Sequence, residues 1–309
     1  MSDRTFTKTQ FDGNAGRSSR HPEASFASNP EPRRGEGSLA QDRLRAEGSP
    51  CFEILRCAQN DVDVAVLLSR SILYQALSFF FRRPDLAQDL SLVDKTRGIW
   101  QAAVDTLPFH NRDRLRGLLD ALLGRLKNTT PKEWAEEYEK LLGHTVKGVA
   151  SAYELEYGEE HTHREPHQLA DITAFYSAFG LKLSNRSHER ADHASVELEF
   201  MYFLLYKEIL ALEDGKEEKA QISMEASRHF LSEHLSYWFP AFSLRVSKYS
   251  KGLLKGIADF AFEFVVQDCL AQNIKPGSQD LPLRAVQEKI EAACVSCEFA
   301  RPVASMEFS

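Results

Sequence analysis

Three ionisable side chains lie close together where a polar segment meets an apolar one, between Glu189 and Glu208. The segment reads ERADHASVELEFMYFLLYKE, and Asp192, His193 and Glu197 lie at or near the start of its apolar part. Asp192 is placed to cap a helix, and His193 and Glu197 share a helical face because they are four residues apart. Imidazole and carboxylate groups on successive turns can bind a cation or act as an acid and a base. The same residues also fit a helix cap beside an ion pair, and on spacing alone we favour that interpretation.

A second candidate is the segment Gly158 to His167, GEEHTHREPH, which mixes three histidines with three glutamates. Histidine-rich segments can bind metal ions. The sequence has no HExxH helix and no paired CxxC knuckles, which would hold further ligands rigidly. We therefore favour a solvated loop, and keep as an alternative a helical metal-dependent hydrolase that uses His161, His163, His193 and Glu197.

Other signals of catalysis are absent from the sequence. It has no GxxxxGK[ST] phosphate loop, no GxGxxG after a strand and no GxSxG elbow, so nucleotide-dependent, dehydrogenase and hydrolase chemistry lack their usual motifs. We predict a protein that is not an enzyme and has no cofactor of its own. Tyr153, Glu154 and Tyr157 form an aromatic and acidic cluster. This cluster fits either a helix end packed on the core or a surface that binds a basic, partly apolar peptide.

Helices must position these residues. From Val62 onward apolar residues recur at spacings of three and four, which is typical of an amphipathic helix, and Pro84 ends this pattern. Further helices are predicted at about 110–127, 131–143, 166–180, 192–214, 217–239 and 250–273. No alternating pattern persists long enough to predict a sheet. We expect an all-α protein with a single helical-bundle domain over residues 61–309. Residues 1–60, rich in Ser, Gly, Pro, Asn and Arg, are predicted to be a disordered N-terminal extension.

Composition limits the partners and the compartment. The chain has 309 residues, of which 43% are hydrophobic and 27% charged, with a formal net charge of −7. A negative protein is a poor candidate for nonspecific nucleic-acid binding and suits a basic partner segment. We find no run of about 18 consecutive apolar residues, so we expect no membrane insertion. Five cysteines form an odd set that fits a reducing compartment, and we predict a cytoplasmic location.

Several segments together resemble the TorD-like (TorD/DmsD/NarJ) redox-enzyme maturation chaperones. They are SRSILYQALSFFFRRPD (69–85), YEKLLGHTVKGVASAYELEYG (138–158), LADITAFYSAFGLKL (169–183), ERADHASVELEFMYFLLYKE (189–208) and HFLSEHLSYWFPAF (229–242). The likeness covers about residues 65–265 and is closest to the branch that serves dimethyl-sulfoxide-reductase-type molybdoenzymes. One position departs from the pattern, because Ala191 stands where family members usually have proline.

The resemblance implies a cytoplasmic chaperone, either a monomer or a domain-swapped homodimer. Such a protein binds the apo catalytic subunit of a molybdopterin-containing oxidoreductase, its twin-arginine signal peptide, or both. It assists insertion of the molybdenum cofactor and prevents premature export. Binding of a guanine nucleotide, suggested for relatives, would be weak or indirect here because the phosphate loop is missing. The identity of the client stays open.

The resemblance also implies roles for individual residues. Those matching the client-binding loops are Glu189, Asp192, His193, Tyr153, Glu154 and Tyr157. Those expected to hold the central helix in place are Glu197, Phe200 and Met201. Carboxylates form charge-assisted forks with arginine, and a helical groove accepts an apolar peptide. We therefore expect that replacing both Asp192 and His193 with alanine weakens client binding without unfolding the domain.

Overall fold

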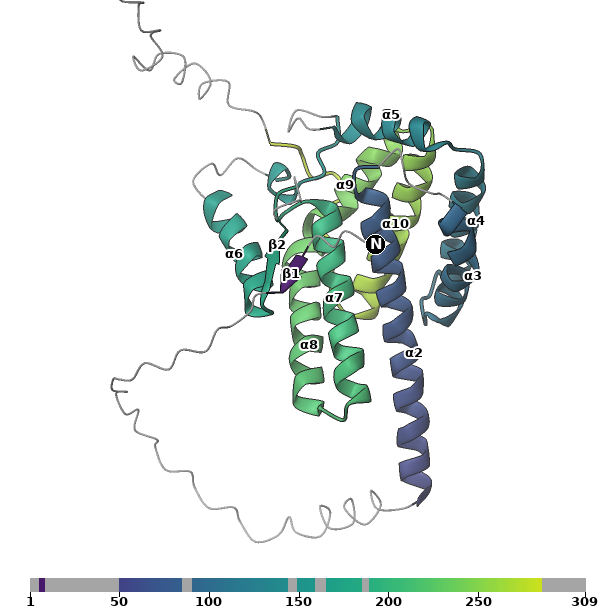
Figure 1. Cartoon of the computed structure of the whole chain (residues 1–309), viewed down its shortest axis with the longest axis vertical. Helices are drawn as coiled ribbons and strands as arrows, with labels where there is room; N and C mark the ends of the chain where they lie inside the picture. The colour runs from purple at the N-terminus through teal and green to yellow at the C-terminus, as the bar shows by residue number, and fades with distance from the viewer. Residues whose placement is uncertain are drawn as a thin grey trace, which may run out of the picture.

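The protein is a bundle of α-helices, as the sequence predicts (Figure 1). The computed structural model describes residues 6–8, 50–84, 91–143, 149–158, 165–184 and 189–284. Its α-helices are α2 (Pro50–Phe81), α3 (Ser91–Thr106), α4 (Arg112–Lys127), α5 (Pro131–Leu142), α6 (Glu165–Ala178), α7 (Ala194–Glu213), α8 (Glu217–Phe230), α9 (Ser236–Tyr249) and α10 (Leu253–Ala271). A 3-10 turn, η1 (Glu154–Glu156), precedes α6, and a π-helix, η2 (Leu231–Leu235), joins α8 to α9.

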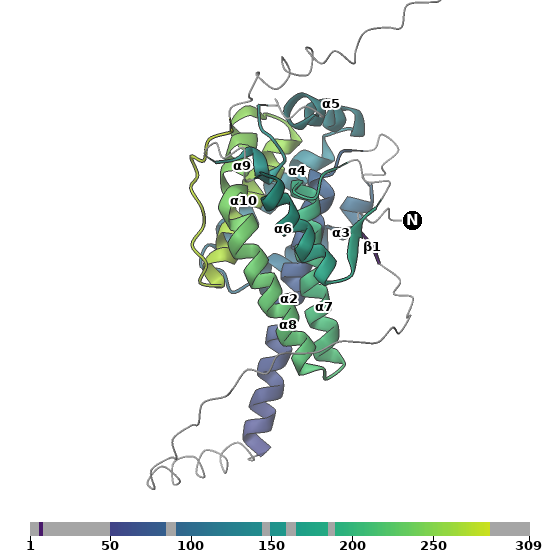
Figure 2. The ribbon, with the colours of Figure 1, turned by 90° about the vertical axis from the view of Figure 1, so that its left-hand side faces the viewer.

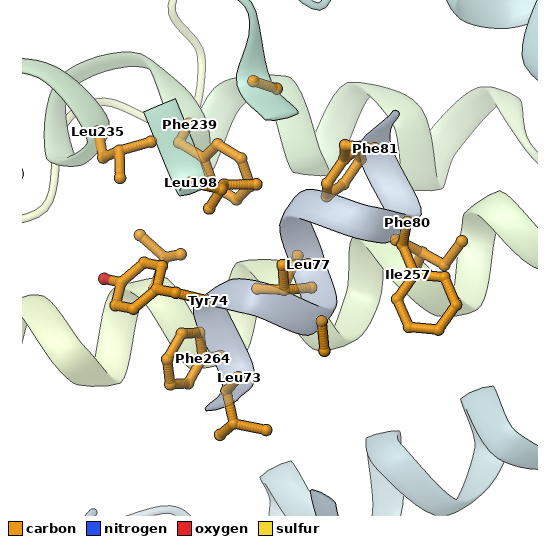
Figure 3. Packing of buried hydrophobic residues seen from close by; sticks show 14 of the residues in the cluster. Leu73, Tyr74, Leu77, Phe80, Phe81, Leu198, Leu235, Phe239, Ile257 and Phe264 are labelled. Carbon is orange, nitrogen blue, oxygen red and sulfur yellow. The ribbon is translucent and has the colours of Figure 1, made fainter. Parts of the chain in front are cut away.

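The core lies around the C-terminal half of α2, which packs against α7, while α10 packs on α9 and α4. Helix α7 lies between α2 and α8 (Figure 1), which explains why its sequence is apolar almost all the way round. Figure 3 shows side chains of α2 lying among those of the neighbouring helices. The labelled residues are Leu73, Tyr74, Leu77, Phe80, Phe81, Leu198, Leu235, Phe239, Ile257 and Phe264.

Local sequence signals account for several helix ends. Helix α5 begins after Thr130, whose hydroxyl accepts a hydrogen bond from the backbone N–H of Glu133, while the Glu133 carboxylate accepts one from the Thr130 N–H. Pro131 occupies the first position of the helix, where a missing N–H costs nothing. Gly215 follows α7 with φ of +66°, a conformation that glycine adopts without strain.

Three predictions about helices need correction. Helix α2 begins at Pro50 rather than Val62, so the expected domain boundary at residue 60 falls inside a helix. Helix α3 was not predicted, although its buried residues Trp100, Ala103 and Val104 have helical spacing. The helix expected over 217–239 contains the π-helix η2 and continues as α9 to Tyr249. In Figures 1 and 2 the N-terminal part of α2 extends beyond the other helices.

One short strand pair also departs from the expectation of no sheet. Strand β1 (Phe6–Lys8) pairs antiparallel with β2 (Leu181–Leu183), with Thr7 opposite Lys182. Strands of three residues are too short to give an alternating pattern in the sequence. The remainder of the predicted N-terminal extension up to residue 49 lies outside the described residues.

The apolar stretch Asp63–Phe81 of α2 is long and apolar enough to cross a membrane by length and composition alone. Asp63, Ser69, Arg70 and Ser71 interrupt its apolar residues, so it holds no long unbroken apolar run. More than half of this stretch is buried inside the protein. A core helix of a globular domain has the same composition, so this feature is weak evidence for a membrane span.

Candidate functional site

Two loops that are distant in sequence meet at the N-terminus of α7. Tyr153 and His193 form an antiparallel bridge. The Glu154 N–H donates to the Asp192 carbonyl at 2.9 Å, and the Ala194 N–H donates to the carbonyl of residue 152 at 2.8 Å. The backbone therefore brings together the two loops that the sequence analysis assigned to one site.

Arg190 lies at the centre of this meeting point, and the sequence analysis did not single it out. Its Nε and Nη2 donate to Oδ1 and Oδ2 of Asp192 at 2.9 and 2.6 Å. Its Nη1 donates to Oε1 of Glu156 at 3.2 Å. The guanidinium carbon lies 4.7 Å from the centre of the Tyr153 ring. Hydrogen bonds to Asp192 raise the pKa of Arg190, although burial opposes this.

Asp192 does not cap α7, which corrects the prediction by one residue. The cap is His193, whose Nδ1 accepts a hydrogen bond from the Ser195 N–H at 3.2 Å. The Asp192 carboxylate instead binds Arg190 and accepts from the Leu155 N–H at 3.2 Å. Burial lowers the pKa of His193. A neutral ring suits the cap, because Nδ1 can accept only while it carries no proton.

His193 and Glu197 are directed to different partners, so the expected pair between them does not form. Nε2 of His193 lies 3.8 Å from the Glu189 carboxylate. The Glu197 carboxylate accepts from Nε1 of Trp238 at 3.0 Å. Burial raises the pKa of Glu197, and the nearby Glu154 carboxylate raises it further. Glu197 therefore belongs to the contact between α7 and α9 rather than to the loop surface.

A layer of polar and aromatic groups lies beneath the loops. Nδ1 of His234 lies 3.1 Å from Oε2 of Glu154, and η2 supplies this histidine. The Tyr157 hydroxyl donates to the Ser151 carbonyl at 2.8 Å, and its ring lies 5.4 Å from that of Trp238. These contacts fix the loop to the core from below.

Phe200 and Met201 lie deeper, in the core of the bundle, where both are fully buried. The Phe200 ring is 4.7 Å from that of Tyr176 in α6 and 4.9 Å from that of Phe230 in α8. Tyr176 in turn donates to the Ala191 carbonyl at 2.7 Å. The central helix and α6 thus together support the loop that carries Arg190 and Asp192.

The predicted client-binding residues differ in their access to the surface. Asp192 and His193 are 0% and 2% exposed, and Glu154 and Tyr157 are also buried. Tyr153 is half-buried, and its hydroxyl donates to Oε2 of Glu189 at 2.6 Å. A partner that approaches the site meets chiefly four partly exposed side chains. They are Tyr153, Glu156, Glu189 and Arg190.

A second chain segment borders the site on its other side. Tyr157 forms an antiparallel bridge with Leu283, and the Gly158 N–H donates to the Pro282 carbonyl at 2.9 Å. The Arg284 N–H donates to the Glu156 carbonyl at 2.8 Å. Residues 282–284, which we call the C-terminal strap, therefore hold the end of the loop that follows Tyr153. No sequence pattern pointed to this contact.

The metal-dependent alternative receives no support from these positions. Among the residues that the structure describes, no three His, Cys, Asp or Glu side chains are grouped to bind a metal ion. His193 caps a helix and Glu197 binds Trp238. His161 and His163 lie outside the described residues.

Several known proteins that are similar to this chain are named as chaperones. Residues 108–243 match the family of the nitrate reductase delta subunit. The chlorate reductase assembly chaperone of Ideonella dechloratans is 33% identical over 131 residues, which are 42% of this chain and 63% of that protein. The selenate reductase assembly chaperone of Thauera selenatis is 37% identical over 78 residues, 25% of this chain and 39% of that protein.

The chaperone protein TorD of Vibrio cholerae is 31% identical over 102 residues, 32% of this chain and 45% of that protein. The chain thus spans less than two thirds of the length of each of these relatives. The family match over residues 108–243 includes both loops of the site. The chain is therefore similar to the TorD-like chaperones over part of its length.

Proposed function

We propose that this protein is a cytoplasmic chaperone for a molybdopterin-containing oxidoreductase of the dimethyl-sulfoxide-reductase type. It binds the apo catalytic subunit, its twin-arginine signal peptide, or both, assists cofactor insertion and prevents premature export. It performs no catalysis and needs no cofactor of its own. The names of the relatives, assembly chaperones for chlorate and selenate reductases, support this proposal.

The observation that carries the proposal is the paired-loop surface beside α7. It presents an aromatic ring and carboxylates on a helical scaffold, in the arrangement of Tyr153, Glu156 and Glu189. Such a surface suits the arginines of a signal peptide, because guanidinium groups stack on aromatic rings and form forks with carboxylates. Charge would set the orientation and the encounter rate of the peptide, and apolar contacts would supply most of its affinity.

Burial divides the predicted site residues into two groups. Tyr153 and Glu189 are proposed to contact the client directly. The buried residues Glu154, Tyr157 and His193 are proposed to hold these two in place, and the buried Asp192 to bind the guanidinium group at the site. Glu197, Phe200 and Met201 are proposed to support the central helix under them. The variant expected from the sequence, with alanine at both Asp192 and His193, is therefore a poor test, because it removes a buried partner of Arg190 and a helix cap.

A sharper test replaces both Tyr153 and Glu189 with alanine. We expect affinity for a synthetic twin-arginine signal peptide, measured by calorimetry, to fall about tenfold or more, since each residue loses a polar contact to the peptide. Circular dichroism should show unchanged helix content, because both residues lie in loops and their side chains are partly exposed. The matched control is Glu139→Ala on α5, which removes an exposed carboxylate that forms an ion pair with Arg83. Equal peptide affinity in the double variant and the control would contradict the assignment of this surface.

Affinity capture of a tagged copy from its native host tests the function as a whole. We expect mass spectrometry to find a molybdoenzyme catalytic subunit whose signal peptide is uncleaved. Its absence, under conditions in which such a subunit is expressed, would overturn the proposed function.

A further inference from the structure

The acidic and aromatic site is occupied by an arginine of the chain itself. The Arg190 guanidinium uses three nitrogens, two on the Asp192 carboxylate and one on Glu156, while it lies over the Tyr153 ring. Proteins recognise a guanidinium group by a carboxylate that accepts two parallel hydrogen bonds, by further carboxylates, and by the face of an aromatic ring. Arg190 makes all three kinds of contact at once.

The two ends of the contact differ in their access to water. The Asp192 side chain is fully buried, whereas 39% of the Arg190 side chain is exposed. Arg190 can therefore exchange this contact for water at a moderate cost. Asp192 cannot, because a buried carboxylate that loses its cation pays the full cost of desolvation. The carboxylate needs a cation at this position, but that cation need not be Arg190.

We propose that Arg190 is an internal ligand of a guanidinium site formed by Tyr153, Glu156 and Asp192, and that an arginine of the client displaces it. The identity of that arginine rests on the proposed function. In the exchange the incoming guanidinium takes over the fork on Asp192, and Arg190 moves into water. Charge at the site is unchanged, so the exchange is nearly balanced and apolar contacts elsewhere in the client decide its direction.

Two properties follow from an internal ligand. The apparent affinity for the client is lower than that of an empty site, because Arg190 must leave first. Lysine is a poor substitute for the client's arginine, because an ammonium group cannot form the planar fork that Asp192 presents. The site would thus distinguish arginine from lysine while keeping its affinity low enough for release.

The first test uses methylguanidinium chloride and needs no client. In the Arg190→Ala variant the site is empty, and we expect millimolar methylguanidinium to raise its melting temperature more than that of the wild type. Methylammonium at the same concentration should raise it less. The matched control is Arg83→Ala, which empties an exposed contact with Glu139. A response of Arg190→Ala no larger than that of this control would overturn the proposal.

The second test compares a twin-arginine signal peptide with the same peptide carrying two lysines. We expect Arg190→Ala to bind the arginine peptide about fivefold to tenfold more tightly than the wild type, and the lysine peptide with unchanged affinity. Should Arg190→Ala not fold, Arg190→Lys keeps the charge without the fork and should shift affinity in the same direction. Equal or weaker binding of the arginine peptide by the folded variant would overturn displacement.

These two tests separate the site from the proposed function. If methylguanidinium stabilises Arg190→Ala but neither protein binds the peptide, the guanidinium site stands and its assignment to a signal peptide is wrong. If the peptide binds to both proteins alike and methylguanidinium has no effect, the proposed function survives and the internal ligand does not.

Discussion

His193 has an unusual task for a histidine, because its ring caps a helix. The cap requires a neutral ring, and burial favours this state by lowering the pKa of His193. The Nδ1 atom receives both the Ser195 N–H and the Ser195 hydroxyl, the latter at 2.8 Å. The remaining ring proton then lies on Nε2, facing Glu189. The imidazole thus fixes the start of α7 and the edge of the site at once.

Replacing His193 tests this role. His193→Ala should lower the free energy of unfolding by about 1–2 kcal/mol, the usual effect of losing a cap side chain. His193→Asn should lose less free energy of unfolding, because the amide oxygen of asparagine can also accept the hydrogen bond from the Ser195 N–H. Urea denaturation followed by circular dichroism measures both values. Equal losses in the two variants would show that the ring acts through packing rather than as a cap.

Glu208 on α7 should make stability depend on pH near neutrality. Burial raises its pKa to about 7, with the nearby Arg70 opposing the shift, and its Oε2 is buried without a hydrogen-bond partner. Because the pKa is higher in the folded state than in the unfolded chain, stability is greatest below pH 4.5 for this group. It is lost as pH rises through 7.

Glu208→Gln should remove that dependence. At pH 8 we expect the variant to be more stable than the wild type by about 1 kcal/mol after allowance for solvent screening. The difference should shrink as the pH falls toward 5. Denaturation midpoints measured at several pH values test this, and a constant difference across the range would contradict it.

At the scale of residues, the family resemblance indicated which side chains share a site but not how they pair. Tyr153 does lie beside His193 and Asp192, through a backbone bridge between two loops that are distant in sequence. The pairing of Asp192 with Arg190 depends on the depth of each side chain, and burial is set by the whole fold. Arg190 could have been noticed as a basic residue between two acidic ones, Glu189 and Asp192.

At the scale of elements, the π-helix η2 sets how α9 is turned. This single π turn inserts one extra residue into a helix that the sequence predicts as regular. That addition directs His234 toward Glu154 and Trp238 toward Glu197. Single π turns inside helices often occur at functional sites. Here η2 connects the bundle to the loop that carries Tyr153.

Deleting Ser232 from η2 should be far more harmful than replacing it. The deletion restores α-helical spacing and turns α9 by about 100° relative to α8. The contacts of His234 and Trp238 are then lost, and we expect a fall in unfolding free energy of about 3 kcal/mol or more. Ser232→Ala is the control, since this exposed side chain can be removed with the spacing kept. A deletion variant as stable as Ser232→Ala would contradict this account.

Helix existence was largely predictable, whereas helix continuity was not. The capped start of α5 and the end of α7 at Gly215 follow from local rules. The interruption at η2 follows from contacts between elements, which periodicity does not record. Helix α3 was missed because its apolar residues do not share one face: Trp100 and Val104 are buried, whereas Ile99 is 52% exposed.

At the scale of the whole molecule, a buried ion pair connects the core helices α2 and α10. Nε and Nη2 of Arg70 on α2 donate to the Asp268 carboxylate on α10 at 2.7 and 3.0 Å. The Tyr74 hydroxyl donates to the same carboxylate at 2.7 Å. Both charged side chains are almost fully buried. This pair fixes the relative position of α2 and α10 through the centre of the bundle.

Asp268→Asn should destabilise the protein by about 3 kcal/mol, because the buried Arg70 loses the carboxylate with which it forms two hydrogen bonds. The double variant Arg70→Met with Asp268→Leu should lose less free energy of unfolding, since apolar side chains of similar size can fill the space. Chemical denaturation of both proteins tests this order. A double variant that is less stable than Asp268→Asn would mean that the pair contributes net stability.

The C-terminal strap has a consequence for the timing of biosynthesis. The loop that carries Tyr153 and Glu156 leaves the ribosome long before residues 282–284, which form its second edge. At ~5–20 residues per second, the interval between Gly158 and Arg284 is on the order of ten seconds. During this interval, Glu156 lacks the backbone hydrogen bond from Arg284 that helps to hold Glu156 beside Arg190. A nascent chain therefore cannot complete this surface until residues 282–284 have left the ribosome.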